Sequence, residues 1–283
     1  MRRLLNAWLA CATTTALRCA TPPLKKTGPQ TPTPFIDDSG LLDRFFMRVF
    51  TARVREELGG DARHGSDDFE GLIEEVRVLN ARGPSPRAAQ AAGRRILRRC
   101  FPPMVSPANG FRVEPLYDAY RQLFAHEVFR PYSAKLNAWV TRACSYWLMG
   151  ASTVGDVETP DATWGDGAHQ KLVVERCRFL EAGGCASACV NLCKIPTQRF
   201  FGEDMGLPLL MEPDYEDFSC TFSFGVAPPP LAVDEALDTP CFSQCPVAVQ
   251  DRPRCHLVDD GDAEAALRDA IRAAPLPERQ TAR

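Results

Sequence analysis

The chain has 283 residues, of which 45% are hydrophobic and 24% charged, and its formal net charge is −3. This composition is ordinary for a globular protein of one or two domains. The slightly acidic balance argues against a general nucleic-acid binder, which needs an electropositive face. No stretch approaches 18 uninterrupted apolar residues, so the sequence predicts no transmembrane span.

The first 36 residues form a leader of different composition. No acidic residue occurs between Met1 and Ile36, whereas basic residues, Thr and Ala are frequent and a Pro-rich run follows. This composition is typical of an organellar transit peptide. The alternative is a secretory signal, because MRR precedes the apolar stretch LLNAWLACATTTAL. Secretion would favour a disulfide framework, whereas a reducing compartment favours metal or redox use of the remaining cysteines.

Residues 37–150 are predicted to be a helical region. Apolar residues recur at helical spacing from Leu41 to Phe50 and from Phe69 to Leu79, and Ser85-Pro86 is a start signal for a third helix. One side of this third helix is basic. It is interpreted either as a solvated face or as a surface that docks on anionic lipid; its residues are Arg94, Arg95, Arg98 and Arg99.

Two further helical stripes are predicted over residues 116–128 and 136–147. Apolar stripes of this spacing usually face a core, and otherwise they line an apolar pocket. The aromatic residues that would form such a groove are Phe124, Phe129, Trp139 and Trp147.

Residues 151–258 are predicted to be a Cys-rich region with a small sheet. Strands are expected at 152–159 and 170–181, a short helix at 185–193 that ends before Pro196, and a second short helix at 197–206. Residues 207–213 and 218–225 form a predicted hairpin with Cys220 on its buried face. A last helix near 262–274 lies in the predicted tail, 259–283. The fold class is therefore α+β, with a helical N-terminal half packed on a mainly antiparallel sheet.

Five of the twelve cysteines fall between Cys177 and Cys220, and three of these repeat at a spacing of four. On a helix, sulfurs four residues apart lie about 6 Å apart along the axis, and Cys185 and Cys193 would lie about 12 Å apart. An unbroken helix therefore cannot give all three thiols to one ion. Buried free thiols, disulfides, structural zinc and iron all remain open. The histidines at 126, 169 and 256 are each isolated in the sequence.

The motifs ERCRFLEAGGCASACVNLCKIPTQRFF, GLPLLMEPDYEDFSC, FGVAPPP and PCFSQCP resemble the plastid β-carotene isomerase family of strigolactone biosynthesis. The resemblance implies an iron-containing stromal enzyme that converts all-trans-β-carotene to the 9-cis isomer. The family's thiol positions, and hence the implied metal ligands, are Cys177, Cys185, Cys189, Cys193, Cys220 and Cys241. The spacing after Cys241 departs from the family pattern, which leaves Cys245 and Cys255 outside this set.

The predicted function is thus an iron-dependent carotenoid isomerase, with iron as a cluster or a single ion. One-electron exchange with iron is the preferred way to loosen a polyene double bond, because thiols are abundant and no motif places an acid. The substrate has no polar handle, so its binding must come from apolar burial, and peripheral contact with plastid membranes would deliver it. Two alternatives have no isomerase activity: an iron–sulfur electron-transfer protein, and an interaction protein stabilised by zinc or disulfides.

Overall fold

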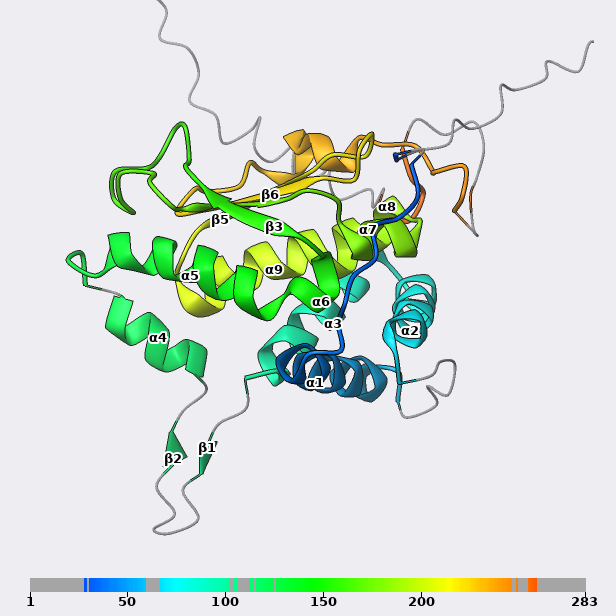
Figure 1. Ribbon diagram of the computed structural model, residues 1–283, viewed down its shortest axis with the longest axis horizontal. Coiled ribbons are helices and arrows are strands. Elements are labelled where there is room, and N and C mark those ends of the chain that lie inside the picture. The colour runs from blue at the N-terminus through cyan, green and yellow to red at the C-terminus, as the bar shows by residue number, and fades with distance from the viewer. Residues whose placement is uncertain are drawn as a thin grey trace, which may run out of the picture.

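The structure is a computed structural model, and it describes residues 28–29, 31–59, 67–101, 104–105, 112–113, 116–124, 126–245, 248 and 254–258. Figure 1 shows a sheet on one side, a middle layer of helices beneath it, and helices α1 to α3 on the far side. Most of the predicted transit peptide and the predicted helix near 262–274 lie outside the described residues.

Three helices form the outer layer: α1 (Leu41–Glu57), α2 (Phe69–Arg82) and α3 (Pro86–Arg99). The predicted helices are confirmed. The side chain of Asp68 accepts a hydrogen bond from the N–H of Gly71 at 2.9 Å, and Ser85 accepts one from Ala88 at 3.2 Å. These contacts satisfy backbone donors that a helix start leaves unpaired.

The basic side of α3 is tied to acidic residues of the protein itself. Arg94 contacts Asp204 at 2.8 Å, and Arg95 and Arg99 contact Glu57 at 2.8 and 2.7 Å. Arg98 lies over the Tyr117 ring, 5.7 Å from its centroid. These arginines therefore join α3 to α1 and to the segment after Arg199, and their charge is compensated within the described part of the chain.

Helices α4 (Leu116–Phe124), α5 (Arg130–Cys144) and α6 (Tyr146–Met149) follow. The prediction that the apolar stripes face the core is wrong for α4 and α5, although Trp147 of α6 is buried. Helix α5 packs under the sheet through the buried residues Ser133, Ala134, Asn137 and Ala138, because small side chains let a helix approach a sheet closely. The large apolar side chains of α4, of α5 and of the turn between them point outward instead. The exposed set is Leu116, Leu123, Val128, Phe129, Tyr132, Leu136, Trp139 and Val140.

The predicted aromatic groove does not form for the same reason. Trp147 lies in the core, 3% exposed and 5.9 Å from the Phe50 ring, whereas Phe129 and Trp139 are 42% and 50% exposed. These side chains therefore do not line a common groove.

The main sheet has the order β3-β4-β6-β5 and is antiparallel throughout. Its strands are β3 (Ser152–Gly155), β4 (Lys171–Val174), β5 (Leu209–Pro213) and β6 (Cys220–Phe224). The predicted β5–β6 hairpin is confirmed, with Leu209 opposite Phe224 and Pro213 opposite Cys220. A second, two-stranded pair joins β1 (Met104–Val105) to β2 (Arg112–Val113).

The strand predicted for residues 170–181 ends at Val174, and α7 (Arg178–Gly183) takes its second half. Phe179 and Leu180 are both buried. Adjacent residues of a strand point to opposite faces, whereas a helix turned into the core can bury both. Cys177 is consequently the N-cap of α7 rather than a strand residue.

The predicted break at Pro196 is also wrong. Helical structure runs without interruption through α8 (Ala186–Cys189), the π-helix η1 (Val190–Lys194), α9 (Ile195–Arg199) and the π-helix η2 (Phe200–Met205). Proline normally clashes with the carbonyl four residues earlier. The wider π turn that precedes Pro196 relieves this clash, so the helix continues. It ends at Gly206, whose φ of +78° favours glycine.

One buried apolar cluster runs from Met47 of α1 through α2, α3 and the middle helices to the sheet and Cys245. A smaller cluster joins Val190 and Ile195 to the described residues after β6, from Ala236 to Val258. The 3₁₀ turns η3 (Leu231–Val233) and η4 (Glu235–Leu237) lie in the same part of the chain. The α+β fold class is confirmed. Within the described residues, no helix is both long and apolar enough to cross a membrane.

Candidate functional site

Four of the predicted ligand cysteines line one cavity of about 20 Å³, called the thiol cavity below. They come from four separate elements: Cys177 caps α7, Cys189 ends α8, Cys193 lies in η1 and Cys220 begins β6. The rest of the lining is almost wholly apolar and consists of Leu148, Met149, Phe179, Leu180, Lys194, Met211, Pro213 and Phe222.

Two local features bring these thiols together. The N–H of Cys177 donates to the carbonyl of Phe218 at 2.7 Å, which holds the start of α7 beside the start of β6. Cys189 and Cys193 lie four residues apart on the continuous helix, so both can face the same side of it. The cavity therefore lies where the continuous helix from Ala186 to Met205, called the middle helix below, meets the end of the sheet.

Burial keeps the cavity thiols in their neutral form. It raises the pKa of Cys177 from 9.0 to about 11 and that of Cys193 to about 12. The pKa values of Cys189 and Cys220 lie well above 9.0 for the same reason, and neighbouring thiols raise them further. A bound metal cation would reverse this balance, because it stabilises thiolates directly.

A buried lysine adjoins the thiol cavity. Lys194 is 1% exposed; its Nζ lies 2.8 Å from Asp234 Oδ2 and donates to the carbonyl of Met211 at 2.6 Å. The sequence analysis missed this pair. The signal was present, since Lys194 stands between Cys193 and Ile195 in a stretch that is otherwise apolar, but its partner lies forty residues further along the chain.

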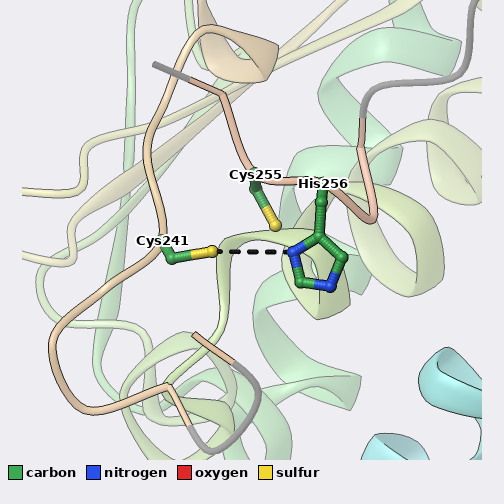
Figure 2. Close-up of side chains that lie close together, drawn as sticks. All are labelled: Cys241, Cys255 and His256. Atoms are coloured by element: carbon green, nitrogen blue, oxygen red, sulfur yellow. Dashed lines mark hydrogen bonds between the residues drawn. The ribbon is translucent and has the colours of Figure 1, made fainter. Parts of the chain in front are cut away.

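The remaining two predicted ligands, Cys185 and Cys241, lie elsewhere, in a second thiol group. This group contains Cys185, Cys241, Cys245, Cys255 and His256. The Sγ of Cys245 donates to that of Cys185 at 3.8 Å, and Cys241 Sγ lies 3.9 Å from His256 Nδ1. His256, which is isolated in the sequence, thus lies beside a cysteine in the structure. Figure 2 shows the Cys241 thiol directed at the imidazole ring, with Cys255 beside both.

Backbone conformation explains why Cys185 leaves the row formed by Cys189 and Cys193. Cys185 is the N-cap of α8 and has extended geometry, with φ −149° and ψ 119°, so its side chain does not follow the helical spacing. The hydrogen bond from Cys245, helped by contacts from Ser187 and Ala188, lowers the pKa of Cys185 from 9.0 to about 5 despite burial.

The two groups differ in spacing. Among the described residues, the ligand atoms of Cys241, Cys255 and His256 all lie within 4.8 Å of one another. No three sulfurs of the thiol cavity lie that close together. The ten cysteines in the described part of the chain form no disulfide with one another. The structure thus holds one compact group of two sulfurs and an imidazole, from Cys241, Cys255 and His256, and a more widely spaced set of four sulfurs around the thiol cavity.

The fold and the buried sulfurs define an α+β protein with a thiol-lined cavity of the kind that binds soft metal ions. Residues 147–233 match the family described as "Beta-carotene isomerase D27-like, C-terminal". Over this segment, the chain is similar to that family, in agreement with the resemblance carried by the cysteine-rich motifs.

The chain is similar to two curated relatives, each named "Beta-carotene isomerase D27, chloroplastic". It is 41% identical to that of Arabidopsis thaliana over 115 residues, which are 40% of this chain and 41% of the relative. It is 37% identical to that of Medicago truncatula over 111 residues, 38% and 42% of the two chains. The chain thus spans about two fifths of the length of these relatives. No solved structure matches it significantly.

Proposed function

We propose that the protein is a plastid carotenoid isomerase that uses iron to interconvert all-trans- and 9-cis-β-carotene, as a step towards strigolactones. The observation that carries this proposal is the thiol cavity, which lies within the segment similar to the chloroplastic β-carotene isomerases. The predicted transit peptide agrees with the word "chloroplastic" in the names of both relatives.

The donor set of the thiol cavity fits iron. Thiolates select iron, zinc and copper(I) over hard cations, and four cysteines are the usual ligands of iron–sulfur clusters. The ligands would be Cys177, Cys189, Cys193 and Cys220, whose wider spacing suits a cluster better than a single tetrahedral ion. Iron held there would supply reversible one-electron exchange, which lowers the order of a polyene double bond long enough for it to rotate.

The residues around the sulfurs support electron exchange more than acid catalysis. The described lining contains no carboxylate and no histidine. Its one cation, Lys194, has its ammonium group bound to Asp234 and to a backbone carbonyl. The apolar walls exclude water, which strengthens every electrostatic interaction inside.

The substrate cannot lie inside the thiol cavity. About 20 Å³ accommodates little more than a water molecule, whereas β-carotene has forty carbon atoms. The outward face of α5, called the α5 apolar face, offers an alternative. It consists of Phe129, Tyr132, Leu136, Trp139 and Val140. Figure 1 shows α5 running towards α6, whose Leu148 and Met149 line the cavity. This face would take up the hydrocarbon at a lipid surface and present it beside the cavity wall.

The test is anaerobic purification of the full chain, followed by metal analysis, a visible spectrum and an isomer assay with all-trans-β-carotene. We expect iron and isomerisation to disappear together in Cys189→Ser and Cys220→Ser. The matched control, Cys144→Ser, changes a thiol outside the cavity and should retain both.

Three outcomes would overturn the proposal. Iron-free protein with undiminished isomerisation would remove the role of iron. A redox-active iron chromophore without any isomer shift would favour an electron-transfer protein. A colourless protein that holds zinc alone, or no metal, would favour a stabilised interaction protein.

A further inference from the structure

The second thiol group lies outside the proposed iron site and serves no step of the proposed reaction. Its members come from two parts of the chain that are far apart in sequence. Cys185 precedes α8, whereas the other four residues follow β6: Cys241 and Cys245 lie at the end of the described range 126–245, and Cys255 and His256 lie in the range 254–258. Cys255 interacts electrostatically with both Cys241 and Cys185, and Cys245 contacts Cys185 at 3.8 Å, so the two parts of the chain are neighbours here.

The spacing of these atoms matches tetrahedral zinc. Zinc binds sulfur at about 2.3 Å and imidazole nitrogen at about 2.0–2.1 Å, so the edges of its tetrahedron are about 3.8 Å between sulfurs and about 3.6 Å between sulfur and nitrogen. Cys241 Sγ lies 3.9 Å from His256 Nδ1. Cys255 completes a trio whose ligand atoms all lie within 4.8 Å of one another. Small side-chain rotations would bring the three to the required edges.

The candidate for the fourth ligand is Cys185. Its Sγ is not among the ligand atoms that lie within 4.8 Å of one another, so it would move towards the trio on metal binding. Cys185 is the acceptor and Cys245 the donor in their 3.8 Å contact. An acceptor sulfur is one that presents its lone pairs, as a metal-bound thiolate does, and a neighbouring donor is the usual support of such a ligand. Cys245 therefore acts as the orienting partner of Cys185.

The site also has a structural task. Within the described residues, the segment after β6 has only the short turns η3 and η4 as regular structure. It is attached to the rest of the protein by the Lys194–Asp234 pair and by hydrogen bonds from Tyr215 Oη to the carbonyl of Ala236 at 2.7 Å and from Asn191 Nδ2 to the carbonyl of Leu257 at 2.8 Å. A metal bridge from this segment to Cys185 would add a further attachment, one that forms only in the folded chain.

We infer that Cys185, Cys241, Cys255 and His256 form a closed structural Zn²⁺ site, separate from the thiol cavity, which fastens the C-terminal segment to the start of the middle helix. Four protein ligands leave no open position, which distinguishes a structural from a catalytic zinc site. Within the described residues, iron and zinc would then occupy different sets of cysteines.

The experiment measures zinc and iron per chain in the full-length protein and its variants. Cys241→Ser and His256→Ala should lose the zinc and keep the iron. Cys189→Ser should lose the iron and keep the zinc, and Cys100→Ser should keep both. Because zinc and iron are measured separately, the zinc content still tests this inference if the thiol cavity proves to hold no iron. The iron content likewise tests the proposed function if no zinc is bound.

Should a variant fail to fold, wild-type protein depleted of zinc is titrated with Co²⁺, whose visible absorption reports tetrahedral thiolate ligands. Proteolysis within residues 231–258 should slow when Zn²⁺ is restored. The inference is overturned if Cys241→Ser retains wild-type zinc, if both metals are lost together in every variant of either group, or if Cys185 and Cys245 prove to be joined by a disulfide in a zinc-free chain.

Discussion

Replacement of Lys194 by methionine should be among the most damaging single changes near the thiol cavity. The side chains of Lys194 and Asp234 are 1% and 4% exposed, and the two charged groups lie 2.8 Å apart. Asp234 would keep its hydrogen bond from the N–H of Ala236 at 3.1 Å but would become a buried carboxylate without a counter-ion. Breaking a buried pair in this way costs about 3–5 kcal/mol.

The measurement is urea denaturation of Lys194→Met, monitored by tryptophan fluorescence. The double variant Lys194→Met/Asp234→Asn removes both charges and should regain most of the loss, because no buried charge is left unpaired. Arg254→Met is the matched control. It breaks the Arg254–Asp238 pair, whose side chains are 38% and 62% exposed, and should cost less than about 1 kcal/mol. Equal losses in Lys194→Met and Arg254→Met would refute the reasoning.

Three further predictions concern separate features. Burial raises the pKa of Cys100 from 9.0 to about 11, so the thiol ionises at lower pH in the unfolded chain than in the folded one. Above pH 9, the wild type should therefore lose up to about 1.4 kcal/mol of stability per pH unit relative to Cys100→Ala. The loss should level off near pH 11, where the folded thiol ionises as well. Urea denaturation at pH 8 to 11 checks this, and parallel curves would contradict it. Gly93→Ala should destabilise the fold by about 1–3 kcal/mol, because the added Cβ would lie 2.7 Å from the Pro196 ring. The control is Gly202→Ala, whose Cβ meets nothing within 4 Å and which should be neutral or stabilising. A higher melting temperature for Gly93→Ala than for Gly202→Ala would contradict this packing. The double variant Leu136→Glu/Trp139→Glu should bind phosphatidylcholine vesicles more than about tenfold more weakly in a sedimentation assay. The control is Val233→Glu, which changes another exposed residue. Unchanged vesicle binding in the double variant would remove the α5 apolar face from the proposal.

The zinc assignment alters how the cysteine-rich sequence is understood. Cysteines that lie close together in the chain belong to different thiol groups of the structure, and cysteines that lie far apart belong to the same group. Cys185 lies only four residues before Cys189, yet its thiol contacts that of Cys245 at 3.8 Å.

The sequence by itself determined the features that depend on local chemistry. Alternation over residues 218–225 placed Cys220 on a buried face, Ser85-Pro86 located the start of α3, and the cysteine-rich motifs pointed to the family before any comparison. Each of these signals lies within a few residues of the feature that it predicts, which is why it can be found without tertiary information.

Only the tertiary structure decided which side of α5 is buried and which thiols meet. A periodic apolar stripe predicts a helix, but the direction of the stripe depends on what the helix packs against, and here the sheet favoured the small side chains of Ala134 and Ala138. The grouping of the cysteines depended on the π turn at Val190–Lys194 and on the extended backbone of Cys185. The pairing of Lys194 with Asp234, and of Cys241 with His256, required chain segments that fold back from a distance, and no local pattern encodes that return.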